Sequence, residues 1–391
     1  MSLTSPEDAP RLSRFEIARP AFATSQEATL DWLARAHTLA EQTRTGEGFV
    51  DDAGQFHDRL RKVLGRVACG PDVLASRGHD VPDCGHQSWD EMRIYDVHRH
   101  PEGAGTAART ALFARIALAA FERLYEAEEE APRELVHVTC TGYASPSAAQ
   151  RLVAKRSWGH STRVTHAYHM GCYAALPAVR IAAGLLASAR GAARADIVHT
   201  EICSLHMHPC DHDIEQLVVQ SLFADGHVRY AVERGPVRRS ALAVLAQREE
   251  ILPGSTDEMT WTSGDHGMHM TLGREVPAMI AANARPFVEA LFEEAGLSLR
   301  AHGSAAVFAV HPGGPRIIDA VQHALDLQDG QVASSRDVLL RFGNMSSATL
   351  PHVWRQIAED DAIRHGTLVA TLAFGPGLTV SGALLLKEEC Q

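Results

Sequence analysis

The stretch VTHAYHMGCYAALPAVRIAAGLLASAR, residues 164–190, contains the pattern that is most informative about the fold. Residues 164–172 predict a strand that ends in a turn of small residues. Residues 173–190 are mostly apolar over a length typical of a helix, which indicates a buried one. Two later stretches, residues 305–315 and 336–361, repeat the order of strand and turn, followed by a helix. The repetition predicts an α/β protein in which three turns can meet.

Outward from this stretch, the remaining sequence alternates between the same two kinds of element. Ser25 is placed to cap a helix, and the run after Thr106 has apolar residues at helical spacing. The expected helices and strands, in chain order, lie at residues 26–43, 106–130, 135–142, 195–206 and 367–387. Because strands and helices alternate in both halves, we expect mostly parallel sheets covered by helices.

The composition limits the class of protein. The 391 residues suggest two or three domains, or one large duplicated domain. A net charge of −11 is unlike the basic surface of a nucleic-acid-binding protein. No apolar run approaches the roughly 18 to 20 residues of a membrane span, and residues 1–16 lack the apolar core of a signal peptide. Because the seven cysteines show no framework spacing, we expect a cytoplasmic protein with free thiols.

Each of the three turns carries one side chain with useful chemistry. Cys172 lies at the expected start of a helix, where the helix dipole favours a thiolate. His311 precedes Pro-Gly-Gly-Pro at the end of an apolar strand, where open α/β sheets place their active sites. Asn344 offers amide donors that suit an oxyanion hole. Taken singly, the three have structural alternatives: a buried inert cysteine, a core histidine and a helix N-cap.

Six segments in one order carry a family resemblance: VTCTGYASP, MGCYAALPAVRIA, QSLFADGHVRYAV, FAVHPGGPRIIDAV, GNMSSAT and AFGPGLTV. Together they resemble the type III polyketide synthases, the chalcone and stilbene synthase family with its thiolase-like fold. The similarity runs from about residue 10 to the C-terminus. It implies a five-layered αβαβα fold made of two similar halves, residues 1–240 and 241–391, and a homodimer.

The resemblance also implies roles for particular residues. Cys172 matches the acyl-accepting nucleophile, His311 the catalytic histidine, and Asn344 its partner in decarboxylation. Phe223 matches the aromatic gatekeeper at the base of the coenzyme A tunnel. Three further positions match residues that shape or line the cavity: Gly375, Gly377 and Ser346.

The chain departs from the plant enzymes of this family where the starter pocket is expected. Cys203, Leu205 and His206 stand at about the places where those enzymes carry Thr, Val and Thr. With a cysteine at position 203, Cys203, the chain resembles the bacterial members of the family that make naphthol or alkylpyrone products. His206 predicts a more polar pocket. Met270 stands in place of a second aromatic gatekeeper, and its flexible side chain favours a larger acyl chain.

The resemblance implies a polyketide synthase that needs no metal and no bound organic cofactor. An acyl-CoA starter loads on Cys172, malonyl-CoA extends it by decarboxylative condensation, and cyclisation gives a pyrone or a phenol. The methionine at position 270, Met270, favours an alkylpyrone or alkylresorcinol as the expected product. The CoA phosphates require cations, for which the candidates are Arg59, Arg61, Lys62 and Arg77.

Three other functions stay open. The ketoacyl synthase that starts fatty-acid synthesis has the same fold and triad, although HPGGP and GPGLT favour the polyketide synthases. A non-catalytic acyl-binding subunit is the second, and the joint presence of Cys172, His311 and Asn344 argues against it. The third is a zinc hydrolase built on HMHPCDHD, residues 206–213, whose spacing matches no zinc template.

Overall fold

The structure is a computed structural model, and it describes residues 9–46, 49, 53–126, 129–188, 194–235 and 240–388. Its strands are β1 Arg11–Ala18, β2 Phe22–Ser25, β3 Ser76–His79, β4 Glu134–Thr139, β5 Arg163–Tyr168, β6 Arg194–Glu201, β7 Gly226–Glu233, β8 Ala241–Ile251, β9 Met259–Gly264, β10 Gly267–Leu272, β11 Val307–Val310, β12 Leu368–Gly375 and β13 Thr379–Glu388. Its α-helices are α1 Gln26–Thr45, α2 Ala53–Val67, α3 Thr106–Leu124, α4 Ala148–Lys155, α5 Ala175–Ser188, α6 Ile214–Leu222, α7 Val276–Glu294, α8 Leu299–His302, α9 Pro315–Leu325, α10 Ala333–Phe342 and α11 Thr349–Glu359. Two short 3₁₀ turns matter for the site, η4 Cys203–Leu205 and η7 Ser346–Ala348.

Nine strands form one sheet whose pattern repeats, in the order β11-β12-β13-β8-β1-β7-β6-β4-β5. In one half, β1 pairs antiparallel with β7, β7 antiparallel with β6, and β6 parallel with β4. In the other half, β8, β13, β12 and β11 pair in the same three ways. The halves meet where Arg11 and Leu12 pair with Ala243 and Leu242. The expected construction from two similar halves is therefore confirmed.

The expectation of mostly parallel sheets is wrong. Parallel pairing is confined to β4–β5, β4–β6 and β11–β12, and the other five neighbouring pairs are antiparallel. For one of these antiparallel pairs the reason lies in the connection between the strands. β12 and β13 are joined by a tight turn at residues 376–378, which requires antiparallel strands.

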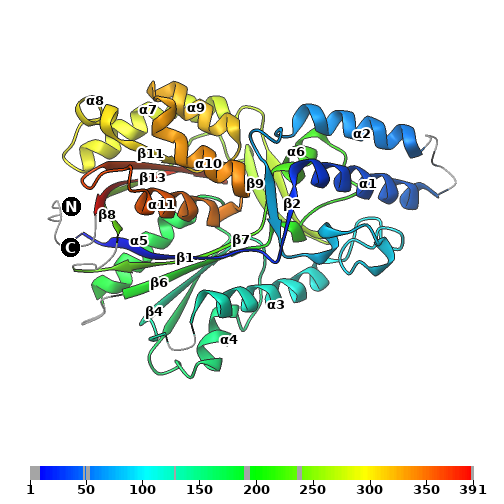
Figure 1. The fold of residues 1–391 in the computed structure, drawn as a ribbon, viewed down its shortest axis with the longest axis horizontal. Coiled ribbons are helices and arrows are strands. Elements are labelled where there is room, and N and C mark those ends of the chain that lie inside the picture. The colour runs from blue at the N-terminus through cyan, green and yellow to red at the C-terminus, as the bar shows by residue number, and fades with distance from the viewer. Residues whose placement is uncertain are drawn as a thin grey trace.

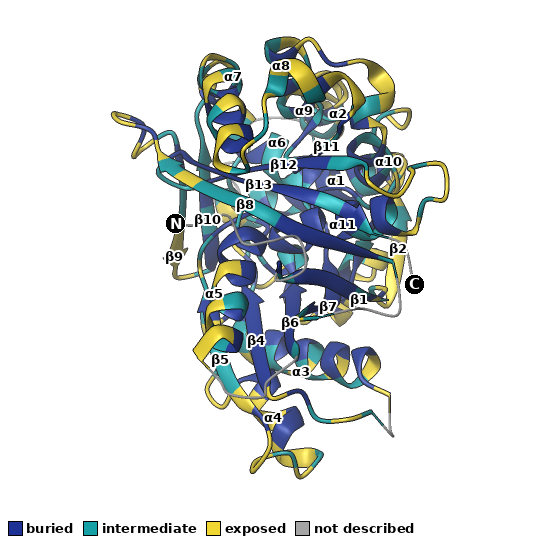
Figure 2. Ribbon diagram, turned by 90° about the vertical axis from the view of Figure 1, so that its left-hand side faces the viewer, coloured by how far each residue is buried: buried dark blue, intermediate teal, exposed yellow. Residues whose placement is uncertain are grey.

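Most of the helices lie in three layers, which separate the two halves of the sheet and cover them, whereas α1, α2 and α6 lie together at one end of the molecule (Figure 1). α5 and α11 lie between the halves, and their apolar side chains pack with residues of both, among them Val136 and Val369. α3 and α4 cover one outer face, and α7 and α9 cover the other. The strands between them are mostly buried, whereas the outer helices expose one side (Figure 2). This is the five-layered αβαβα arrangement that the resemblance implies.

Most of the predicted elements are confirmed, and one is wrong. Helix α1 begins after Ser25, whose Oγ accepts the Ala28 N–H at 3.2 Å. Helix α3 ends at Leu124, before the predicted end at residue 130, and residues 127–128 of that prediction lie outside the described residues. The run RDVLLRF, residues 336–342, predicts a strand but belongs to helix α10. None of the helices in the described part of the chain combines the length and apolarity that a bilayer crossing needs.

Candidate active site

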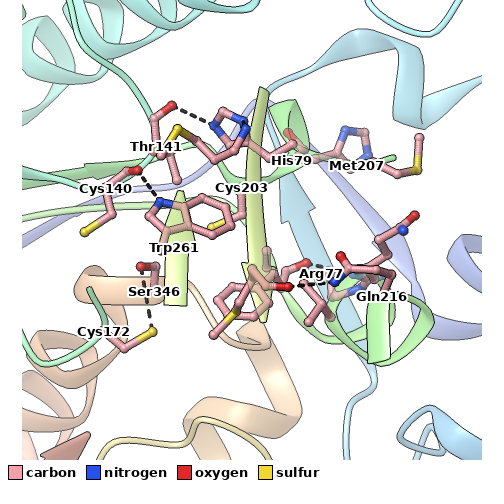
Figure 3. Close-up of a pocket in the computed structure, with 18 of the residues that line it drawn as sticks. Arg77, His79, Cys140, Thr141, Cys172, Cys203, Met207, Gln216, Trp261 and Ser346 are labelled. Carbon is pink, nitrogen blue, oxygen red and sulfur yellow. Dashed lines mark hydrogen bonds between the residues drawn. The ribbon is translucent and has the colours of Figure 1, made fainter. Parts of the chain in front are cut away.

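One cavity lies where loops of the first half of the chain meet helices α1 and α6 and the β9–β10 hairpin (Figure 3). Six of the residues singled out from the sequence line it: Cys172, Cys203, His206, Phe223, Met270 and Ser346. Arg77, one of the predicted CoA contacts, also lies in its wall. Four other predicted site residues are not part of the cavity wall: His311, Asn344, Gly375 and Gly377.

Cys172 lies in a tight loop between β5 and α5. Gly171 has a φ of +83°, and a Cβ at this position would lie 2.4 Å from Cδ of Pro376, so only glycine fits. The Gly171 N–H donates to Sγ of Cys140 at 3.0 Å. The Gly171 carbonyl accepts the Ala174 N–H, which starts the turn into α5. Cys172 therefore stands just ahead of the helix, as the sequence predicts.

The Cys172 thiol is buried, and the expected thiolate is not supported. Its Sγ lies 3.9 Å from Oγ of Ser346, a residue with a φ of +51°. Burial raises the pKa of Cys172 to about 12, the hydrogen bond to Ser346 acts to lower it, and the Glu201 carboxylate acts to raise it. Desolvation is the largest of these effects, and it favours the neutral thiol.

His311 follows directly on β11, and its backbone N–H bonds the Leu372 carbonyl at 2.8 Å. Its ring is buried, and neither Nδ1 nor Nε2 has a hydrogen-bond partner among the described residues. Burial lowers the pKa of His311 to about 3, so the ring is neutral. Two unpartnered nitrogens are costly in a purely structural histidine, and this favours a functional one.

Asn344 is fixed by its backbone and by its side chain. Its N–H bonds the Leu222 carbonyl at 3.2 Å, and its carbonyl accepts the Ala224 N–H at 2.8 Å, which places it beside Phe223. Its Oδ1 accepts the Ser346 N–H at 2.9 Å. Because Oδ1 serves this turn, Nδ2 is the group that the amide can offer to a ligand as a donor.

The turn after His311 and the turn around Asn344 meet at the end of α6. A Cβ at Gly314 would contact the Leu222 side chain at 3.5 Å, and Leu222 also accepts the Asn344 N–H. The structure therefore brings these two turns and Phe223 to one corner of the molecule. It shows no hydrogen bond between His311 and Cys172.

His206, which was expected to make the pocket more polar, uses both of its ring nitrogens to bridge two backbone groups. Its Nδ1 accepts the Met268 N–H at 3.0 Å, and its Nε2 donates to the Thr141 carbonyl at 2.8 Å. Both nitrogens are used, which fixes the proton on Nε2. The ring packs edge-on against Trp261 with centroids 5.6 Å apart, and burial lowers its pKa to about 3. Neither ring nitrogen is therefore free to bond a ligand.

The β9–β10 hairpin forms a cavity wall of which only Met270 was expected from the sequence. Nε1 of Trp261 donates to the Cys140 carbonyl at 2.7 Å, which fixes the indole in the cavity wall (Figure 3). Nε2 of Gln216 donates to the Met270 carbonyl at 2.6 Å. The cavity is also rich in methionine: Met207, Met259, Met268 and Met270. The signal was the strand period, because residues two apart on a strand share one face.

Glu201, at the end of β6, is a second residue that the sequence reasoning missed. Its buried carboxylate accepts the Cys140 N–H at 3.0 Å, Oγ1 of Thr141 at 2.9 Å and the Ser347 hydroxyl. Burial raises the pKa of Glu201, and these hydrogen bonds act against the rise. The carboxylate therefore ties the loop after β4 and the turn η7 to the end of β6, and these two segments carry Cys140, Thr141 and Ser346 of the cavity wall.

The glycines of AFGPGLT act through packing rather than by lining the cavity. A Cβ at Gly375 would lie 2.1 Å from the Tyr173 ring, and Gly377 has a φ of +72°. They allow Pro376, which does line the cavity, to approach the loop of Cys172. These two glycines therefore act on the shape of the cavity indirectly.

The polar side chains of residues 206–213 bind to other residues and do not gather around one point. Nε2 of His208 bonds the Met268 carbonyl at 2.9 Å, and Asp211 lies 3.4 Å from Nε2 of His269. Among the residues that the structure describes, no three His, Cys, Asp or Glu side chains gather in a way that could hold a metal ion. The geometry therefore gives no support to the zinc hydrolase alternative.

Comparison with known families gives two adjoining matches. Residues 110–236 match the family described as chalcone and stilbene synthases, N-terminal domain. Residues 243–388 match the C-terminal domain of the same family. The first match contains Cys172, and the second contains His311 and Asn344.

Two curated relatives extend this similarity. Bisdemethoxycurcumin synthase of Oryza sativa subsp. japonica is 33% identical over 263 residues, which cover 64% of this chain and 64% of that protein. The 1,3,6,8-tetrahydroxynaphthalene synthase of Streptomyces coelicolor is 30% identical over 256 residues, which cover 64% of this chain and 65% of that protein. The chain therefore matches just under two thirds of the length of these relatives.

A solved structure has the same fold over nearly the whole chain. The C-terminal type III polyketide synthase domain of Steely1, a type I/III hybrid from Dictyostelium, matches with a TM-score of 0.79 and 21% identity. The match covers 98% of this chain and 100% of that one. The thiolase-like fold expected from the sequence is therefore confirmed.

Proposed function

Because the chain belongs to the chalcone and stilbene synthase family, we propose that it is a type III polyketide synthase that acts on CoA thioesters. The observation that carries the proposal is the Cys172 thiol in the wall of a largely apolar cavity, inside the matched N-terminal segment. The two partners that the family implies, His311 and Asn344, lie inside the matched C-terminal segment.

The reaction begins with acyl transfer to Cys172. The sulfur attacks the thioester carbonyl of the starter, its proton passes to His311, and the bond to the CoA sulfur breaks. CoA then leaves as a thiol with the proton that His311 returns. Unpartnered nitrogens on a neutral imidazole support the role of base. Because burial raises the pKa of Cys172 to about 12, the proton moves during the attack rather than before it.

Malonyl-CoA then extends the chain. The bond between its carboxylate carbon and its methylene carbon breaks, CO₂ leaves, and the electron pair forms an enolate of the thioester. His311 and Nδ2 of Asn344 donate hydrogen bonds to the enolate oxygen. The enolate carbon attacks the acyl group on Cys172, which lengthens the chain by two carbons and releases the thiolate. The hydrogen bond that engages Oδ1 of Asn344 supports Nδ2 as the donor.

The starter in this proposal is a flexible apolar acyl chain. Trp32 and Leu33 of α1 line the cavity together with Met268 and Met270 of the hairpin. Methionine side chains adapt to irregular apolar ligands. His206 offers no free nitrogen to a phenolic hydroxyl, because both are bonded to backbone. These features favour an alkylpyrone or alkylresorcinol over a product that starts from an aromatic acid.

The proposal includes a homodimer. β5 is an edge strand that pairs with β4, and no other described strand pairs with it. Tyr143 is 42% exposed and packs edge-on against Tyr168 of β5. Because an open strand edge with an exposed aromatic side chain favours pairing with another strand, we expect a second copy there. Light scattering should give twice the chain mass, and a monomer would contradict this part of the proposal.

The experiment for the activity combines the purified protein with malonyl-CoA and a panel of acyl-CoA starters, read by mass spectrometry. We expect products spaced by two-carbon units, with the highest yield from alkyl starters. Cys172→Ala should abolish them, whereas Cys69→Ala, a control outside the cavity wall, should retain them. A single condensation on a carrier-protein substrate would instead indicate a ketoacyl synthase. No product with either substrate would indicate a non-catalytic acyl-binding subunit.

A further inference from the structure

Arg77 of β3 lies in the cavity wall, and its guanidinium is only partly used (Figure 3). The residue is 6% exposed. Its Nη1 donates to the carbonyls of Gln220 and Phe223 at 2.8 and 2.7 Å. Because these carbonyls lie at the C-terminal end of α6, the two bonds cap the helix and hold the guanidinium in one orientation.

The other side of the guanidinium has donors without acceptors. Nε and Nη2 of Arg77 are buried, and neither has a hydrogen-bond partner among the described residues. These two nitrogens share one edge of the planar group, and their N–H bonds on that edge are parallel. Such a pair matches the two oxygens of a carboxylate, which Arg binds in a bidentate manner. Arg77, a residue of the cavity wall, therefore carries a fork suited to a carboxylate.

The charge of Arg77 also calls for an anion. Burial lowers the pKa of Arg77 to about 10, with Asp225 among the groups that act to raise it, so the group stays charged at neutral pH. Asp225 itself is engaged elsewhere, because it accepts the Asp80 N–H at 2.7 Å and the Ser204 N–H at 2.8 Å. A buried cation without a paired anion is costly, and a carboxylate ligand would reduce that cost.

We propose that the Nε–Nη2 edge of Arg77 binds the free carboxylate of malonyl-CoA. The inference rests on the proposed polyketide synthase function. The carboxylate is the group that distinguishes malonyl-CoA from acetyl-CoA, since both carry the same CoA. The Phe223 carbonyl that holds Arg77 belongs to the residue matched to the gatekeeper of the CoA tunnel. When the carbon–carbon bond breaks, CO₂ leaves uncharged, so the fork favours binding of malonyl-CoA over binding of the decarboxylated product.

The test compares the affinities of malonyl-CoA and acetyl-CoA, measured by titration calorimetry on protein that carries Cys172→Ala. Titrations run briefly at low temperature, and mass spectrometry verifies that the malonyl-CoA stays intact. We expect the parent to bind malonyl-CoA at least about tenfold more tightly, which is the effect of a charge-assisted bidentate pair. Adding Arg77→Met should bring the ratio close to one while acetyl-CoA still binds. Arg77→Lys keeps the charge without the fork and should give an intermediate ratio.

Arg61→Met serves as the matched control. Arg61 is predicted from the sequence as a contact to the CoA phosphates, which both ligands carry, so its loss should change both affinities by the same factor. Its malonyl-to-acetyl ratio should equal that of the parent. An equal affinity of the parent for both ligands would overturn the proposal. An unchanged malonyl-to-acetyl affinity ratio in both Arg77 variants would also overturn it. An equal loss of affinity for both ligands would do the same, because Arg77 would then act only as a cap of α6. Failure of the synthase function itself is separate, because it appears as absent products with the unmodified protein.

Discussion

Gly171 sets the position of Cys172 through two constraints that act together. Its φ of +83° is strained for any residue with a side chain, and a Cβ would lie 2.4 Å from Cδ of Pro376. Gly235 shares the φ of +83° but has nothing within 4 Å of its Cβ position. The pair therefore separates backbone strain from steric conflict.

We expect Gly235→Ala to lower the free energy of unfolding by about 1 to 2 kcal/mol, which is the cost of the backbone conformation alone. Gly171→Ala should lower it by about 2 to 5 kcal/mol, because overpacking adds to the same strain. It should also slow acyl loading strongly, because the loop of Cys172 must move away from Pro376. Urea unfolding and an acyl-loading assay measure the two effects. Equal losses of stability in the two variants would contradict this account of the loop.

At the residue scale, the sequence predicts which side chains lie close together. It predicts their protonation states and hydrogen-bond partners less well. Cys172, Phe223 and Ser346 line one cavity, as their segments predict. The protonation state of Cys172 depends on how much water the whole fold excludes, which no local motif reveals. The role of His206 depends on Thr141 and Met268, both about 60 or more residues away in the sequence.

At the scale of elements, the N-cap of α1 gives a clean test of a sequence-level prediction. Oγ of Ser25 accepts the Ala28 N–H at 3.2 Å, whereas Ser298, the N-cap of α8, makes no such side-chain bond. Ser25→Ala should therefore cost about 1 kcal/mol of unfolding free energy, and Ser298→Ala much less. Urea unfolding of the two variants measures the difference. A Ser298→Ala cost that equals or exceeds that of Ser25→Ala would show that the cap bond is unimportant.

Helices with a capping residue and a long periodic pattern are predictable, and short apolar runs are not. The run VLL in α10 has too few residues to show its period, but the structure pairs Asp337 with Arg341 on helical spacing. The β9–β10 hairpin shows a different difficulty. Its pairing of Met259 with Leu272 is visible only with both strands in place, so the cavity wall around Trp261 escaped the sequence reasoning.

At the scale of the whole molecule, buried histidines determine how stability responds to acid. Six of them have pKa values lowered to about 3 or 4, with burial as the largest cause: His37, His137, His199, His206, His311 and His352. Their unfolded-state pKa is about 6.5. Below that pH the unfolded chain binds more protons than the folded one, so stability is present above about pH 6.5 and is lost as the pH falls.

We therefore expect the urea midpoint to fall steeply between pH 7 and pH 5. Each such histidine contributes about 1.4 kcal/mol per pH unit once it is protonated only in the unfolded chain. His352→Gln should reduce the slope by the share of one histidine, because it removes one titrating group. Unfolding curves at pH 7.5, 6.5 and 5.5 provide the measurement. A midpoint that is the same at all three values would contradict the neutral, buried state of these rings.

At this scale the sequence predicts the layers of the architecture, but it does not predict the directions of the strands. Alternating strands and helices predict layers, and the resemblance predicts two similar halves, which the repeated strand order confirms. Strand direction depends on whether a connection crosses over or turns back. Where β12 turns directly into β13, the alternation breaks, and the sheet becomes mixed rather than mostly parallel.

The most direct test of the central claim, that Cys172 carries the acyl chain, is the mass of the intact protein after brief exposure to an acyl-CoA. We predict a gain equal to the acyl group less one hydrogen, located on the peptide that contains Cys172 and absent in Cys172→Ala. Hydroxylamine, which cleaves thioesters, should remove the added mass. A protein that forms product without this adduct, or an adduct that persists on another cysteine in Cys172→Ala, would contradict the account.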